Sequence, residues 1–189
     1  MKAYDAIVIG SSAGGMYALK NLIQGLKPGF RIPLIIVQHL SPHSDNYLAH
    51  FLDQLGILRV KEADERESIK PGHAYIAPPN FHLLIENDHT FSLTVEEKVN
   101  YARPSIDVLF ETAAGVFRDR LIGIILTGAN HDGANGIKSI RSFGGFTIAQ
   151  NPATAESDIM PKAAIATGKI DKIWDINEIS GFLNSLSNT

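Results

Sequence analysis

The chain has 189 residues, of which 44% are hydrophobic and 20% charged, in the proportions of an ordinary globular protein with one well-packed domain. It contains no cysteine, which excludes disulfides, thiolate metal ligands and a cysteine nucleophile, and its net charge of −3 gives no reason to expect nucleic acid as a partner. The N-terminal apolar run is too short for a signal peptide and no stretch approaches the roughly 20 apolar residues of a membrane span, so we predict a soluble, cytoplasmic protein without an integral membrane segment.

The first half of the chain alternates short apolar runs, which predict buried strands, with segments whose apolar residues recur at helical spacing. In chain order, we expect a strand over Ala6–Ile9, a helix over Gly15–Leu26, a strand over Leu34–Val37, a helix over Asp45–Leu55 capped by Ser44 or Asp45, a strand over Ala74–Ala77, and a hairpin of His82–Glu86 and Thr90–Val95.

The second half continues the alternation. We expect helices over Ser105–Phe117, Ala134–Phe143, Met160–Thr167 and Ile176–Leu186, and strands over Leu121–Thr127, Phe146–Gln150 and Ile170–Ile173. Strands separated by helices predict an α/β fold with a doubly wound, mostly parallel sheet, helices on both faces and an appended antiparallel β-hairpin. No repeat or linker interrupts the pattern, so residues 1–189 are predicted to form a single domain.

Three loops are predicted to leave strands at one edge of the sheet. They are residues 10–15 (GSSAGG), residues 38–43 (QHLSPH) and residues 127–133 (TGANHDG). Ligands of open α/β sheets bind beyond the carboxyl ends of the strands, where these loops lie. The loops offer a serine, a histidine and an aspartate, so we expect the functional site there.

The glycine-rich first loop has two common uses, to cradle a phosphate or to present a serine nucleophile. As a cradle it lacks the second glycine of G-x-G-x-x-G, where Ser12 stands, and it lacks a Gly-Lys-Ser/Thr ending. As a nucleophile turn, residues 10–14 match G-x-S-x-G between a predicted strand and a predicted helix, with Ser12 as the nucleophile. Ser11 is a rival, but it stands at the x position of the motif. The backbone N–H of Ala13 would be placed to donate to an oxyanion. Small residues are equally typical of tight packing between a strand and a helix, so this loop alone leaves the choice open.

A serine nucleophile needs a base, and His39 is the best candidate because it directly follows a predicted buried strand. Asp132 would then orient the other ring nitrogen. Each has a plain alternative, His39 as a structural histidine and Asp132 as the cap of the following helix. His39 and His43 lie four residues apart, as in some metal sites, but Pro42 between them disfavours a helix, and no metal site is predicted.

The remaining histidines are predicted to lie outside the site. His131 is a rival base, but adjacent side chains rarely face each other, so its neighbour Asp132 is expected to serve His39 instead. The other four stand in polar or turn contexts and are expected at the surface: His50, His73, His82 and His89.

Taken together, these motifs resemble those of a known family. Residues 10–15, the Gln38-His39 pair and residues 126–136 (LTGANHDGANG) are similar to three motifs of the catalytic domain of chemotaxis protein-glutamate methylesterases, the CheB type. Residues 74–79 (AYIAPP), 103–107 (RPSID) and 160–161 (MP) match the same family. The resemblance covers nearly the whole chain.

The resemblance implies an enzyme that hydrolyses the γ-methyl ester of glutamate on chemoreceptor helices, releases methanol, and in some members deamidates receptor glutamines. The family nucleophile, base and orienting acid correspond to Ser12, His39 and Asp132, the residues chosen above from their chemistry. No metal or cofactor is expected. The expected partner is a methylated chemoreceptor or a related helical protein.

The resemblance also implies roles around the triad. The backbone N–H groups of Ala13 and Ala129 are predicted to hold the oxyanion. Arg103 is predicted to steer an acidic helix toward the site, with a plain surface charge as the alternative.

Two departures from the family keep other interpretations open. Many members have threonine after the nucleophile and G-M-G in the late motif, where this chain has Ala13 and Ala129-Asn130. Members usually carry an N-terminal phospho-receiver domain, and because this sequence begins just before the first strand, we expect a stand-alone esterase. A non-catalytic or differently specific binding module on the same fold is the second interpretation, and a nucleotide- or phosphate-binding domain is the third.

Overall fold

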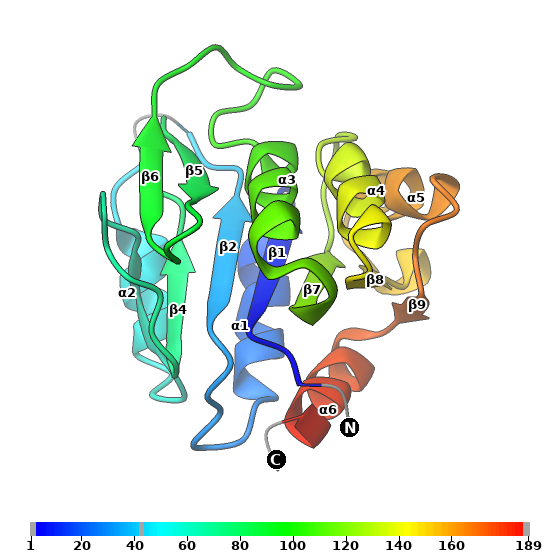
Figure 1. Cartoon of the computed structure of the whole chain (residues 1–189). Coiled ribbons are helices and arrows are strands. Elements are labelled where there is room, and N and C mark those ends of the chain that lie inside the picture. Colours follow the sequence, from blue (N-terminus) through cyan, green and yellow to red (C-terminus); the bar gives the residue numbers. More distant parts are fainter. Residues whose placement is uncertain (1–2, 42–43, 187–189) are drawn as a thin grey trace.

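The structure, a computed structural model, describes residues 3–41 and 44–186. Its centre is a seven-stranded, wholly parallel sheet in the order β3-β4-β2-β1-β7-β8-β9 (Figure 1). The strands are β1 (Ala6–Ser11), β2 (Leu34–Gln38), β3 (Arg59–Glu62), β4 (His73–Ile76), β7 (Leu121–Ile125), β8 (Phe146–Gln150) and β9 (Lys172–Trp174). A separate antiparallel hairpin joins β5 (His82–Ile85) to β6 (Phe91–Thr94).

Helices cover both faces of the sheet (Figure 1). They are α1 (Gly15–Gln24), α2 (Tyr47–Asp53) and α6 (Ile176–Leu186) on one face, and α3 (Ile106–Phe117), α4 (Ala134–Ser142) and α5 (Ile159–Ala166) on the other, with short 3₁₀ turns at Arg118–Arg120 and Pro152–Thr154. Alternate residues of β1 enter the two cores, Ile7 and Ile9 toward α1, and Ala6 and Val8 toward α3. The predicted doubly wound α/β fold with its appended hairpin is confirmed.

Three local predictions differ from the structure. The strand β3 was not predicted, because it is an edge strand in which only Val60 is buried, and its charged neighbours hide the apolar pattern. The helix α2 begins at Tyr47 after Asn46, and Asp45 accepts a hydrogen bond from the Tyr47 N–H through its side chain at 3.1 Å. The last strand begins at Lys172, two residues later than predicted.

The order of the strands creates a crevice beside β1. The neighbours of β1 are β2 and β7, and the chain passes from β1 to α1 on one face but from β7 to α4 on the other. This is a topological switch point, where the loops diverge and ligands of such sheets bind. Gly14 and Gly133 precede the two helices at φ +76° and +99°, which only glycine adopts without strain, so both loops turn sharply beside the crevice.

The described helices do not include one that is long and apolar enough to cross a membrane.

The helices α3 and α4 pack against each other through a glycine. An added Cβ at Gly136 of α4 would lie 2.4 Å from the Cβ of Phe110 in α3. Because that atom is fixed to a helix backbone, the helices would have to separate. We expect Gly136→Ala to lower the free energy of unfolding by about 1–3 kcal/mol, measured by urea denaturation.

A matched control lies in α3 itself. Gly115 is exposed, and an added Cβ there meets nothing within 4 Å. Gly115→Ala adds the same methyl group to a helix and should raise the free energy of unfolding by about 0.5–1 kcal/mol through helix propensity. Equal effects of the two substitutions would contradict the packing argument.

Candidate active site

The three predicted loops meet at the carboxyl ends of β1, β2 and β7. The N–H of Ser12, just after β1, donates to the Thr127 carbonyl at 2.9 Å, which joins the first loop to the third. The N–H of His39, just after β2, donates to the Ser11 carbonyl at 3.0 Å. The Asp132 carboxylate then lies 2.9 Å from His39 Nε2. The histidine and the aspartate chosen from sequence are therefore hydrogen-bonded partners beside the serine turn.

The serine turn distinguishes its two hydroxyl groups. Ser11 is fully buried, and its hydroxyl donates to Gln38 Oε1 at 2.6 Å. The amide of Gln38 in turn donates to the carbonyls of Ser12 and His39. The turn needs Gly15, because a Cβ there would lie 1.8 Å from Gln38 Oε1. Ser11 thus holds the turn in place, whereas Ser12 is half-buried and lines an open cavity.

His39 has a defined tautomer. Its Nε2 faces the Asp132 carboxylate at 2.9 Å, and its Nδ1 lies 3.1 Å from the side-chain amide nitrogen of Asn130. An amide nitrogen can only donate, so Nδ1 accepts and the ring proton is on Nε2. Nδ1 is therefore the nitrogen on which His39 can take up a proton.

Asp132 lies in a buried cage of donors at the N-terminus of α3. Its two oxygens accept hydrogen bonds from the side chains of His39, Asn100 and Ser105 and from the backbone N–H groups of Ile106 and Asp107. Burial acts to raise the pKa of Asp132, but the bonds from His39, Asn100 and Ile106 outweigh it, and the pKa is lowered. The positive end of the α3 dipole favours the same charge. Asp132 is an anion positioned to hold a histidine.

The position of Asp132 bears on both alternatives for the third loop. The cap of α4 is Gly133, and the Asp132 carboxylate faces α3 instead. His131, the rival base, is exposed, and Asp132 is occupied by His39. The structure therefore favours Asp132 as the partner of His39.

The surface prediction for His82 is wrong. His82 is buried; its Nε2 donates to the Glu97 carbonyl, and its Nδ1 accepts from the Ser105 N–H at 3.1 Å. It belongs to the hairpin that packs on α3, a contact that local polarity cannot reveal. His50 and His89 are exposed and His73 is half-buried. His43, the other member of the histidine pair, and the intervening Pro42 lie outside the described residues.

Ala13 and Ala129 present free backbone donors. Both residues are exposed, and neither N–H donates a hydrogen bond to any group within residues 3–41 and 44–186. The carbonyl of Ala13 is fixed by the Thr127 hydroxyl at 2.8 Å, which links the two loops again. These two N–H groups are available to a ligand, and their role in holding an oxyanion stays a prediction.

A cavity of about 380 Å³ opens in front of Ser12 and His39. Its walls are Ser12, His39, Leu40, Asn130 and the segment 98–104 apart from Val99. This segment, part of the connection from β6 to α3, arches over the carboxyl ends of the strands at the top of Figure 1. Arg103 braces it by donating to Asn80 and to the carbonyls of Val95 and Glu96.

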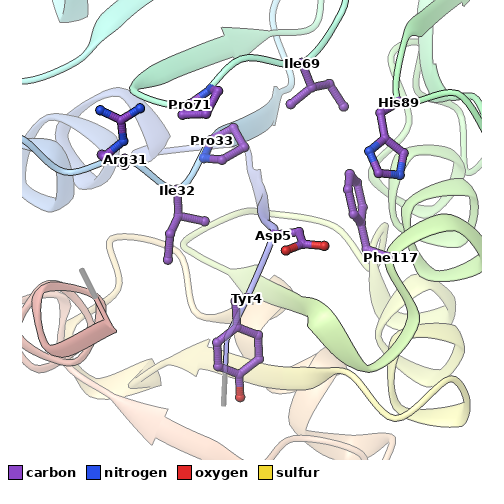
Figure 2. Close-up of a pocket in the computed structure, with 9 residues that line it drawn as sticks. All are labelled: Tyr4, Asp5, Arg31, Ile32, Pro33, Ile69, Pro71, His89 and Phe117. Carbon is purple, nitrogen blue, oxygen red and sulfur yellow. The ribbon is translucent and has the colours of Figure 1, made fainter. Parts of the chain in front are cut away.

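A second cavity, of about 360 Å³, lies at the opposite edge of the sheet. Asp5 and Pro33 stand in it just before β1 and β2, and Phe117 and His89 close its far side (Figure 2). The residues that line it do not include Ser12, His39 or Asp132. The cavity at the carboxyl ends is therefore the candidate active site.

Two residues of the candidate site, Ser105 and Asn100, were not predicted from the sequence. Ser105 was placed only at the start of a helix, although it lies in the RPSID stretch that carries part of the resemblance. Asn100 gave no signal, since nothing local indicates that its amide bridges Asp107 and Asp132 at 2.8 and 2.9 Å.

The two buried carboxylates predict an acid dependence of stability. The pKa of Asp132 is lowered from its ordinary 3.8, so its contribution to stability is present above that pH and is lost as the pH falls through the folded-state value. Burial raises the pKa of Asp107, so Asp107 lowers stability as the pH rises from 3.8 through its folded-state value. We expect Asp132→Asn to make the loss of unfolding free energy below pH 3.8 shallower than in the wild type.

Urea denaturation at a series of pH values checks this expectation. Asp107→Asn is the matched control, because it should change the slope on the other side of pH 3.8. An unchanged acid slope in Asp132→Asn would contradict a lowered pKa.

Comparisons with known proteins agree on one family. A family model described as CheB methylesterase matches residues 7–183. A protein of Leptospira interrogans, provisionally named protein-glutamate methylesterase/protein-glutamine glutaminase, is 51% identical over 94% of this chain and 92% of its own length. The protein-glutamate methylesterase/protein-glutamine glutaminase of Photorhabdus laumondii is 41% identical over 92% of this chain, which spans 50% of that relative. The crystal structure of the Thermotoga maritima CheB methylesterase catalytic domain matches 98% of this chain and 100% of its own, with a TM-score of 0.93 at 36% identity.

Proposed function

The chain belongs to the CheB methylesterase family and is a carboxylic ester hydrolase, and we propose that it hydrolyses glutamate γ-methyl esters through Ser12, His39 and Asp132. The observation that carries this assignment is the buried His39–Asp132 pair beside the Ser12 turn, all at the switch point of the sheet. Relatives are also named protein-glutamine glutaminase, and hydrolysis of a glutamine amide uses the same steps with ammonia as the leaving group.

The first half of the reaction forms an acyl-enzyme. Ser12 Oγ attacks the ester carbonyl while His39 Nδ1 takes the hydroxyl proton. His39 then carries a proton on both nitrogens, and the Asp132 anion stabilises the imidazolium through Nε2–H. When the tetrahedral intermediate collapses, the carbon–oxygen bond to the methoxy group breaks, and methanol leaves with the proton from Nδ1.

The second half repeats these steps with water. His39 Nδ1 takes a proton from the water that attacks the acyl carbon, and returns it to Ser12 Oγ as the glutamate side chain leaves. In both halves negative charge develops on the carbonyl oxygen. The free N–H groups of Ala13 and Ala129 are the proposed donors to that oxygen, since backbone donors survive the loss of the family's threonine and methionine side chains.

The substrate is proposed to be a side chain presented on an acidic helix, such as that of a methylated chemoreceptor. Two features support it. The cavity is open and accepts a protruding side chain, and two cations, Lys98 and Arg103, stand in its wall. Arg103 donates to carbonyls and an amide rather than to a carboxylate, so its positive charge is not cancelled by a bound acid. It therefore keeps its proposed role of steering an acidic helix.

Methanol release is the test. The wild-type protein, incubated with a receptor signalling domain that carries glutamate γ-methyl esters, is expected to release methanol, while the unmethylated domain releases none. A receptor domain with glutamine at the same positions, assayed for ammonia, tests the second activity. Binding of the methylated domain without methanol release would favour the binding module over the enzyme.

A further inference from the structure

Asn130 lies between the base and the backbone of the third loop. Its Oδ1 accepts a hydrogen bond from the Asp132 N–H at 3.0 Å, and its Nδ2 lies 3.1 Å from His39 Nδ1. The backbone N–H of Asp132 fixes the orientation of the amide, because only the oxygen can accept from it. The amino group of Asn130 therefore faces His39.

His39 has only one acceptor to offer. Its Nε2–H donates to Asp132, so the lone pair of Nδ1 is the only site on the ring that can receive a proton. The Ser12 hydroxyl and the Asn130 amide, both donors, line the same cavity as His39. The bond from Asn130 is formed, whereas no hydrogen bond joins Ser12 to His39 within the described part of the chain.

We propose that Asn130 is a positioning residue that occupies His39 Nδ1 in the resting enzyme and must release it before Ser12 is activated. The proposal rests on the roles of Ser12 and His39 given under the proposed function. Release requires rotation of the half-buried Asn130 side chain, which also breaks the hydrogen bond that its Oδ1 accepts from the Asp132 N–H. While the bond to Nδ1 is formed, His39 cannot take the proton of Ser12, so this bond slows the reaction.

Modification of Ser12 by a small fluorophosphonate measures this competition, because that reaction uses the serine and its base without a bound protein substrate. Asn130→Ala removes the competing donor, and we expect a modification rate about twofold to tenfold higher, the equivalent of one ordinary hydrogen bond. Asn130→Asp keeps the acceptor for the Asp132 N–H but turns a carboxylate oxygen toward Nδ1. That oxygen favours a proton on Nδ1, so the rate should fall below that of the wild type.

Controls separate this role from loop support. Asn135→Ala changes an exposed asparagine at the start of α4 and should react at the wild-type rate. In the ¹⁵N spectrum of His39, Asn130→Ala should move the Nδ1 resonance and leave Nε2 in place. An Asn130→Ala rate equal to or below the wild type, or an unmoved Nδ1 resonance, overturns the proposal. A wild-type protein that is not modified at Ser12 overturns the proposed function itself, and this inference with it.

Discussion

Methyl ester hydrolysis by the Ser12→Ala variant is expected to fall by roughly 10⁴-fold to 10⁶-fold, because the acyl-enzyme cannot form without the hydroxyl. The side chain of Ser12 makes no hydrogen bond within residues 3–41 and 44–186, so its removal should leave the fold intact. Methanol release under saturating substrate measures the loss. The KM of the variant should stay close to the wild-type value, since the cavity walls are unchanged.

Ser11→Ala is the matched control for this prediction. It removes the adjacent hydroxyl, whose bond to Gln38 holds the turn, but it leaves the proposed nucleophile in place. We expect turnover to stay within about tenfold of the wild type, the equivalent of one structural hydrogen bond. A large loss in Ser11→Ala together with near-normal turnover in Ser12→Ala would reassign the nucleophile.

Asp132→Asn should lower turnover by about 10⁴-fold, because the carboxylate holds His39 in the tautomer that leaves Nδ1 unprotonated. In the part of the chain that the structure describes, the hydrogen-bond partners of the two Asp132 oxygens are all donors, including the fixed backbone N–H groups of Ile106 and Asp107. An amide at this place must turn its own amino group toward donors, whichever way it is oriented. The variant therefore disturbs both the tautomer and the start of α3.

Thermal unfolding of Asp132→Asn, measured beside its turnover, shows how much of the loss comes from destabilisation. Ser105→Ala removes one donor from the cage and leaves the carboxylate bonded to His39, so its turnover should stay within about tenfold of the wild type. Turnover of folded Asp132→Asn within tenfold of the wild type would contradict the orienting role.

The central strands could be predicted because both of their faces are buried. Every residue of β1, β2 and β7 is buried, so each strand is encoded as a nearly continuous run of apolar residues, which is the pattern typical of a buried parallel strand. The edge strand β3 has one buried residue in four, and its pairing with β4 is a long-range contact without a local signature. The observed helix ends differ from the predicted ones by one or two residues, because a single side-chain bond, such as the one Asp45 accepts from the Tyr47 N–H, can set them.

The meeting of the Ser12, His39 and Asp132 loops could be predicted because parallel strands deliver their following loops to one edge of the sheet. The network behind the triad obeys no such rule. Asn100 and Ser105 reach Asp132 from a loop and a helix start about 30 residues away in sequence, and His82 holds Ser105 from the hairpin. The contact of Asn130 with His39 depends on side-chain orientation, which no spacing encodes.

The most direct measurement is the position of the covalent adduct left by a fluorophosphonate on the folded protein, read by fragment mass spectrometry, which separates Ser11 from Ser12. We expect a single adduct on Ser12, formed at a rate that falls by several orders of magnitude in His39→Gln. An adduct on another residue, or none on the folded wild-type protein, would contradict it.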